Sequence, residues 1–124
     1  MRLCVQYALT HPYRAPAVIP QLDLTQVSKM TFSKPDTETF TLLRLALSSI
    51  DDGGAVPATL NAANEIAVEA FLNRRIGFRA IFDTVEETVS TLRASAKRAH
   101  TLTEIFDFDV AARELARELI ERNG

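Results

Sequence analysis

The chain has 124 residues, 47% of them hydrophobic and 24% charged, which is typical of one ordinary soluble domain. Its 14 basic and 16 acidic side chains leave a net charge of -2 and are interspersed, so no segment favours nucleic acid or an anionic membrane as a partner. No apolar stretch approaches the roughly 20 residues of a membrane helix, and residues 1–20 lack the apolar centre of a secretory signal.

The first 34 residues form a proline-rich arm that differs from the rest of the chain. Residues 1–9 favour a short helix over a strand, and we expect it to end before Pro12, because the residue before a proline avoids the helical region. Residues 11–20 are predicted to be extended. Leu22, Leu24 and residues 30–32 are predicted as short extended pieces that lack partner strands in this chain. The missing strands are a first reason to expect that the chain is part of a longer protein.

From residue 35 onward, apolar residues recur with helical spacing. A first helix is predicted to bury one face and to end at residues 51–54; that face comprises Leu43, Ala46, Leu47 and Ile50. A second should run from about Pro57 to about Asn73, since a proline suits the first turn of a helix. Its buried stripe comprises Leu60, Ala67, Val68 and Phe71. A third begins near Phe78 with the clearest stripe, formed by Phe78, Ile81, Phe82, Val85, Val89 and Leu92.

The C-terminal region is predicted to contain a capping box and a last helix. Thr101 and Glu104 have the spacing of the box, which we expect before a short turn at residues 105–106, with Asp107 or Asp109 capping the helix. This helix should bury Phe108, Ala112, Leu115 and Leu119, and pair Glu114 and Glu118 with Arg117 and Arg122 on its outer face. The sequence thus predicts an all-α fold, with a small four-helix bundle over residues 35–124 preceded by an extended, proline-rich arm over residues 1–34.

The most unusual polar motif comprises Asn61, Asn64 and Glu65. Asn64 follows Leu60 by four residues, so it falls on the predicted core face, where an amide without partners costs about 1 to 3 kcal/mol. These side chains either grip another segment or a ligand, or they form a self-contained polar pocket inside the bundle. We favour a structural role.

Other reactive side chains form no complete catalytic arrangement. Glu65 and Glu69 lie one turn apart, but a metal site or an acid–base pair would need further donors. His11 and His100 lack zinc-site spacing and are expected to be exposed, whereas Cys4 is expected to be packed. A single cysteine excludes an intrachain disulfide and fits a reducing cytoplasm. Since a Gly-rich nucleotide turn, a phosphate loop and a Ser-His-Asp arrangement are all absent, we assign no catalytic, cofactor-binding or metal-binding residue to the chain.

The segment around this polar motif is strongly similar to a known family. Leu60-Asn61-Ala62-Ala63-Asn64-Glu65-Ile66-Ala67-Val68-Glu69-Ala70-Phe71-Leu72, followed by Arg75-Ile76-Gly77-Phe78, resembles the C-terminal helical domain of the 1-deoxy-D-xylulose 5-phosphate reductoisomerases. Further matches occur in the family's order: Met1-Arg2 with Gln6-Tyr7-Ala8-Leu9 and Pro12, Leu22-Asp23-Leu24, residues 42–46, and Ala111-Ala112-Arg113-Glu114. The resemblance covers nearly all of the chain.

The resemblance implies the C-terminal portion of a cytoplasmic oxidoreductase of isoprenoid biosynthesis. Such an enzyme rearranges 1-deoxy-D-xylulose 5-phosphate and reduces the product with NADPH to 2-C-methyl-D-erythritol 4-phosphate, using Mg or Mn. The family places its nucleotide and metal sites in N-terminal domains that are missing here, so this chain is expected to bind no cofactor and to be inactive alone. Residues 1–34 would end the catalytic domain, and the full-length enzyme would be a homodimer.

The resemblance suggests a role for Met1, and the polar motif suggests one for its own residues. Met1 matches a methionine that lies beside the substrate in the family. The bundle is expected to support the catalytic domain. The buried amide pattern of the polar motif suggests, in addition, that Asn61, Asn64 and Glu65 hold the proline-rich arm to the bundle. The alternative is a free-standing helical module for protein interactions.

Overall fold

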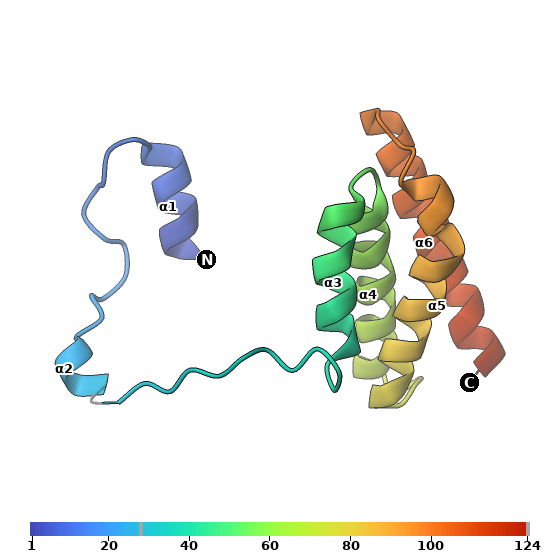
Figure 1. Ribbon diagram of the computed structural model, residues 1–124, viewed down its shortest axis with the longest axis horizontal. Coiled ribbons are helices and arrows are strands. Elements are labelled where there is room, and N and C mark those ends of the chain that lie inside the picture. The colour runs from blue at the N-terminus through green and yellow to red at the C-terminus, as the bar shows by residue number, and fades with distance from the viewer. Residues whose placement is uncertain (28, 124) are drawn as a thin grey trace. The chain divides into compact units, whose positions relative to one another are not determined.

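Residues 35–124 form one of two structural units in the chain, and residues 1–34 form the other. A computed structural model describes residues 1–27 and 29–123, and this part contains six α-helices and no strand (Figure 1). The second unit holds four of these helices: α3 (Thr41–Asp52), α4 (Val56–Leu72), α5 (Phe78–Ala96) and α6 (Leu102–Asn123). The prediction of an all-α fold with a four-helix bundle is confirmed.

Helix α4 lies at the centre of the bundle and contacts the other three helices. Its buried face is rich in small side chains, namely Ala62, Ala63, Ala67 and Ala70. Branched side chains of α5, such as Val85 and Val89, pack into the same core together with Leu119 and Ile120 of α6. Alanines let neighbouring helices approach closely, and the branched residues fill the space between them.

Two fully buried threonines, Thr59 and Thr88, do not disturb this core, because both hydroxyls have a backbone partner. Thr59 Oγ1 donates to the carbonyl of Ala55 at 2.9 Å, and Thr88 Oγ1 donates to that of Thr84 at 2.8 Å. These bonds to the preceding turn satisfy polar atoms that burial would otherwise penalise.

The face that α3 buries differs from the prediction. Leu42 and Leu45 pack against the core and Ser49 is buried, whereas Leu43, Leu47 and Ile50 are exposed. Two rows of α3 have helical spacing, and the way α3 packs on α4 and α5 decides which of them is covered. The prediction that Leu43, Leu47 and Ile50 are buried was therefore wrong.

Helix α6 is longer than predicted. It begins at Leu102, directly after Thr101, and its first turn forms the predicted capping box. Thr101 Oγ1 accepts a hydrogen bond from the Glu104 N–H at 3.2 Å, and the Glu104 carboxylate accepts one from the Thr101 N–H at 2.9 Å. Because the box satisfies the first free N–H groups, no turn interrupts the helix at residues 105–106. Asp109 lies within α6 and caps nothing.

The first unit contains α1 (Arg2–Thr10) and α2 (Leu24–Val27), joined by residues 11–23 without helix or strand. Helix α1 agrees with the helix predicted over residues 1–9. The prediction of an extended piece was wrong at Leu24, which begins α2, and Leu22 and residues 30–32 lie in neither helix nor strand. Neither α1 nor α2 has a buried residue. Among the residues that the structure describes, no helix is both long and apolar enough to cross a membrane.

Candidate functional site

Asn61 and Glu65 belong to a group of polar side chains that connects α4 to α6. Asn61 Nδ2 donates to Glu65 Oε1 at 2.9 Å, and Arg113 Nη2 donates to Glu65 Oε2 at 2.7 Å. Arg113 also donates through Nε to Asp109 Oδ2 at 2.8 Å. We call Asn61, Glu65, Asp109 and Arg113 the α4–α6 polar cluster.

The electrostatics of this cluster favour a charged, static network. The hydrogen bond from Arg113, followed by the one from Asn61, lowers the pKa of Glu65. Hydrogen bonds to Asp109 and then to Glu65 raise the pKa of Arg113. At neutral pH Glu65 is therefore an anion with both oxygens engaged. The cluster is suited to joining two helices and poorly suited to proton transfer.

Asn64 and Glu69, the other polar residues singled out on α4, stand apart from this cluster. Asn64 is only half-buried, so the prediction that its amide lies inside the core was wrong. The side chain lies at the edge of the buried face of α4, next to the fully buried Ala63. Glu69 is exposed. In residues 1–27 and 29–123, no three His, Cys, Asp or Glu side chains gather where a metal ion could be held.

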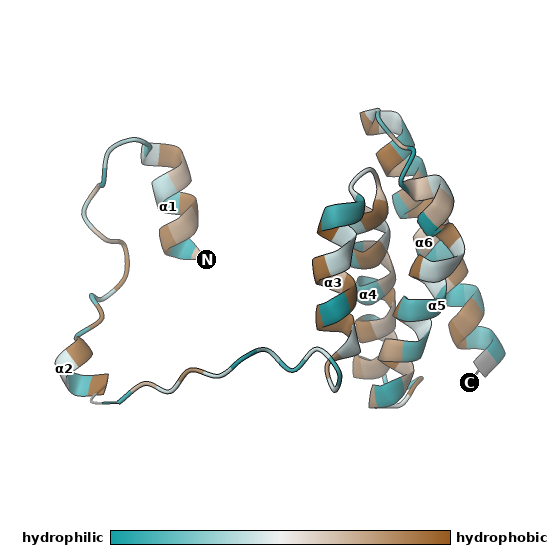
Figure 2. Ribbon diagram, in the orientation of Figure 1, coloured by the Kyte–Doolittle hydropathy of each residue, from teal (hydrophilic) through white to brown (hydrophobic). Residues whose placement is uncertain are grey.

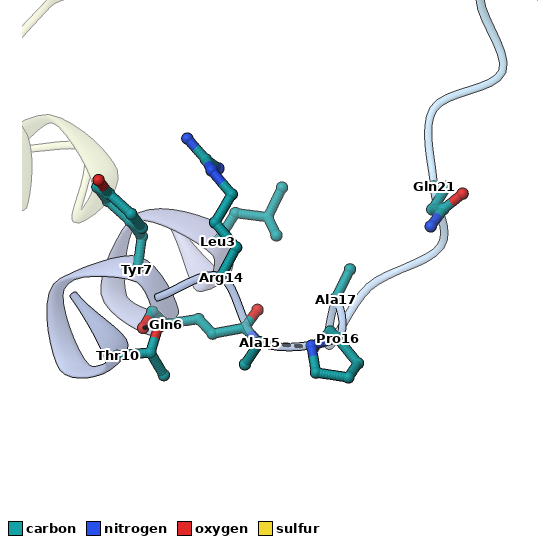
Figure 3. A pocket seen from close by; sticks show the side chains of 9 residues that line it. All are labelled: Leu3, Gln6, Tyr7, Thr10, Arg14, Ala15, Pro16, Ala17 and Gln21. Carbon is teal, nitrogen blue, oxygen red and sulfur yellow. Dashed lines mark hydrogen bonds between the residues drawn. The ribbon is translucent and has the colours of Figure 1, made fainter. Parts of the chain in front are cut away.

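The first unit has a hollow of about 430 Å³ between α1 and the turn that follows it (Figure 3). The Arg14 guanidinium lies 4.7 Å from the centre of the Tyr7 ring, a cation–π contact. Gln6 Nε2 donates to the Pro16 carbonyl at 2.6 Å, and the Val18 N–H donates to Gln6 Oε1 at 3.4 Å. Gln6 thus uses its amide to hold the turn against α1.

The remaining predicted residues are mostly exposed. Met1 is fully exposed and lines an apolar hollow with Val5, Leu9 and Val18. The His11 ring stands edge-on to Tyr7 with 5.7 Å between ring centres. Cys4 is exposed, so the prediction that it is packed was wrong. It lies on α1, a helix with no buried residue, and therefore has no core to pack into.

Sequence reasoning missed several polar contacts between helices. Arg122, predicted to pair with Glu118 within α6, instead donates to Glu87 of α5 at 2.7 Å. Arg113 was not singled out, although it follows Asp109 by four residues, a spacing that favours an ion pair on one face of a helix. Its bond to Glu65, 48 residues away, had no signal in the sequence.

Comparisons with known proteins agree over almost the full chain. A family model described as the DXP reductoisomerase C-terminal domain matches residues 1–115. The 1-deoxy-D-xylulose 5-phosphate reductoisomerase of Paraburkholderia xenovorans is 45% identical over 122 residues, which are 98% of this chain and 30% of that protein. The enzyme of the same name from Chlorobium phaeobacteroides is 46% identical, with 98% of this chain and 31% of that protein covered.

A solved structure gives the same result in three dimensions. The 1-deoxy-D-xylulose 5-phosphate reductoisomerase of Zymomonas mobilis, in complex with NADPH, matches with a TM-score of 0.76 and 41% identity. The match covers 94% of this chain and 30% of that one. The chain therefore spans about 30% of the length of the proteins it resembles.

Proposed function

Since this chain belongs to the family of DXP reductoisomerase C-terminal domains, we propose that it is the helical domain of an enzyme that rearranges and reduces 1-deoxy-D-xylulose 5-phosphate with NADPH. The observation that carries this proposal is the 45% identity over 98% of the chain to a relative of that name. The product is 2-C-methyl-D-erythritol 4-phosphate, made in the cytoplasm for isoprenoid synthesis, and the full-length enzyme is a homodimer. The same similarity favours the enzyme over a free-standing interaction module.

The role of this chain within the enzyme is support. The charged side chains of its α4–α6 polar cluster are paired with one another, so they are poorly suited to chemistry. A divalent ion such as Mg or Mn would polarise the substrate's oxygens. The described residues offer no group of three ligands for such an ion, and we assign no step through it to this chain. Residues 1–34 are the end of the catalytic domain and its connecting arm, and residues 35–124 are the bundle.

A chimera tests the assignment. In the Paraburkholderia xenovorans enzyme, this chain would replace the aligned 122 residues. We expect NADPH oxidation that depends on 1-deoxy-D-xylulose 5-phosphate. A matched chimera with Ala67→Asp should lose both its folding and its activity, because Ala67 is fully buried and an unpaired charge there is strongly unfavourable. A folded chimera that binds NADPH but does not turn over the substrate would refute the assignment, and an active enzyme lacking the segment would refute the support role.

Met1 is proposed to lie beside the substrate, as a fully exposed apolar side chain is free to do. In the chimera, Met1→Ala should raise KM for 1-deoxy-D-xylulose 5-phosphate and leave Tm unchanged. Leu9→Ala, which alters an equally apolar exposed residue of α1, is the matched control and should leave KM unchanged. Equal effects of the two substitutions would remove Met1 from the substrate site.

Asn61, Asn64 and Glu65 are proposed to hold the proline-rich arm to the bundle. Asn64→Leu should then lower Tm or increase hydrogen exchange in residues 11–20, whereas Asn73→Leu, at the exposed end of α4, should do neither. An Asn64→Leu variant with unchanged Tm and unchanged exchange in the arm would disprove this role.

A further inference from the structure

The side-chain amide of Gln6 ties α1 to the turn that follows it, residues 11–18, at two points (Figure 3). Its Nε2 donates to the Pro16 carbonyl at 2.6 Å, and its Oε1 accepts from the Val18 N–H at 3.4 Å. A primary amide has both donors and an acceptor, so one side chain can bind two backbone groups. In an extended chain, the carbonyl of one residue and the N–H two residues later point to the same side. Pro16 and Val18 therefore present a matched pair of groups to Gln6.

The two ends of this turn are held in different ways. At its start, the His11 and Tyr13 N–H groups donate to backbone carbonyls at 2.9 Å each. Residues 15–20 form no hydrogen bond from backbone to backbone within the part of the chain that the structure describes. Among them, the Val18 N–H is the one that donates to a side chain. The position of this later stretch against α1 thus depends on Gln6.

Helix α1 has few other contacts that fix its orientation within the first unit. None of its residues is buried, although brown, apolar stretches recur along it in Figure 2. The Tyr7 ring contacts Arg14, and Thr10 Oγ1 lies 2.9 Å from the Tyr13 carbonyl oxygen. Both contacts reach only the first residues of the turn. The Gln6 amide reaches Val18, twelve residues along the chain, and so determines how the rest of the turn lies on α1.

Met1 is the N-cap of α1, and its position follows the orientation of this helix. The Met1 side chain is fully exposed, so no packing within the first unit holds it in place. Side chains of a helix lean toward its N-terminus, and the Gln6 amide therefore reaches back along α1 in the direction of Met1. Val18, which this amide binds, lines the same apolar hollow of about 440 Å³ as Met1. A rotation of α1 against the turn would displace Met1.

We propose that Gln6 is a positioning residue for the reaction. By binding Pro16 and Val18 it fixes α1 on the turn and thereby places Met1 beside the substrate. Gln6 acts through Met1 and does not itself contact the substrate. This inference rests on the proposed function, and within it on the place of Met1 at the substrate. Loss of the two hydrogen bonds weakens substrate binding in the ground state and the transition state alike, so KM rises while kcat changes little.

Gln6→Met in the Paraburkholderia xenovorans chimera tests this role, because methionine has about the length of glutamine and lacks its amide. KM for 1-deoxy-D-xylulose 5-phosphate should rise about fivefold, with kcat within about twofold of the parent chimera. Tm should stay unchanged, since both hydrogen bonds are exposed. Gln21→Met is the matched control and should leave KM unchanged. Gln21 lines the hollow of Figure 3 but takes no part in the bonds to Pro16 and Val18.

A double-mutant cycle shows whether Gln6 acts through Met1. Met1→Ala raises KM by itself, and adding Gln6→Met should produce no further increase, because the side chain that Gln6 positions is already absent. Hydrogen exchange followed by mass spectrometry reports on the turn directly. A peptide spanning residues 15–20 should exchange faster in Gln6→Met than in the parent, because the Val18 N–H loses its acceptor. The same peptide should be unaffected in Gln21→Met.

The outcomes separate the role of Gln6 from the proposed function. An inactive parent chimera would refute the proposed function and this role with it. In an active chimera, an unchanged KM in Gln6→Met would overturn the positioning role alone. KM increases that multiply in the Met1→Ala, Gln6→Met double variant would also overturn it, because Gln6 would then act by another route. A lower Tm with an unchanged KM would make Gln6 a purely structural residue.

Discussion

The carboxylate of Asp52 lies 2.5 Å from the guanidinium of Arg93, and this contact ties the C-terminal end of α3 to the last turn of α5. Lys97 Nζ lies 2.6 Å from the other carboxylate oxygen. The Asp52 side chain is only 10% exposed, so its charge is compensated by the two cations and little by water. The adjacent turn, with Gly53 and Gly54, rests on the same end of α5, since the Ala55 N–H donates to the Ala96 carbonyl at 2.9 Å.

Replacing Asp52 should produce a stability loss that depends on pH. The hydrogen bond from Lys97 and the charge of Arg93 lower the pKa of Asp52 in the folded protein. A lowered folded pKa stabilises the fold above the unfolded pKa, near roughly 3.9, and this stabilisation is lost as pH falls through the folded value. Asp52→Asn should therefore have a lower Tm than the wild-type chain at pH 7, and the difference should shrink below about pH 4.

Thermal unfolding followed by circular dichroism between neutral and acidic pH measures this difference. Asp83→Asn, on the exposed face of α5, is the control and should track the wild-type curve throughout. A Tm difference for Asp52→Asn that stays constant down to acidic pH would show that the charge of Asp52 is not its source.

Arg74 is held in a conformation that suits glycine, and replacing it should stabilise the bundle. Its φ is +58°, and it follows α4 in a turn where the Arg74 and Arg75 N–H groups donate to Phe71 and Ala70 at 2.9 Å each. This pattern is a Schellman motif, whose left-handed position disfavours a side chain. Arg74→Gly should raise the free energy of unfolding by about 1 kcal/mol. Urea denaturation measures the change. Arg75→Gly, at a negative φ, should instead lower stability, and a gain in both variants would contradict the conformational explanation.

Thr101 should matter for stability through its hydroxyl alone. Its Oγ1 accepts from the Glu104 N–H at 3.2 Å and its N–H donates to the Glu104 carboxylate, so it closes the capping box of α6. Thr101→Ala should lower the free energy of unfolding by about 1 kcal/mol. Thr103→Ala, two residues further along the exposed start of α6, is the control and should stay within about 0.5 kcal/mol of the wild-type chain. Equal losses in urea denaturation would mean that the box contributes nothing specific.

The sequence predicted those helix limits that local signals mark. Pro57 placed the start of α4 to within one residue, and the apolar spacing from Phe78 placed the start of α5. It also identified Thr101 and Glu104 as a capping box. The start of α6 was placed too late, because Asp107 and Asp109 are plausible caps as well, and nothing local shows which candidate the chain uses.

Contacts between helices could not be predicted in the same way. On α3, Leu42 and Leu45 have helical spacing just as Leu43 and Leu47 do, and only the packing of α3 on α4 and α5 decides which row is buried. In the candidate site, too, the local contact could be predicted and the contact between helices could not. Asn61 and Glu65 are one turn apart, and their hydrogen bond is local, but the cation that completes the α4–α6 polar cluster comes from α6.

Gly54 should be the least replaceable residue of the α3–α4 turn. Its φ is +56°, and a Cβ built there would meet the Ala96 carbonyl oxygen and lie 2.9 Å from the Lys97 carbonyl carbon. Both obstacles are backbone atoms at the C-terminal end of α5, in its last residue Ala96 and its C-cap Lys97, and they cannot move aside without breaking the Ala55–Ala96 hydrogen bond. Left-handed strain and overpacking together should make Gly54→Ala less stable by about 3 kcal/mol.

Urea denaturation of two glycine variants separates this crowding from a general effect of adding a methyl group. Gly77→Ala is the control, because its φ is -76° and nothing lies within 4 Å of the added Cβ. It should cost at most about 1 kcal/mol, through a poorer N-cap for α5. Similar losses in the two variants would show that the turn can move away from α5, in which case the Asp52 ion pairs alone would fix the end of α3.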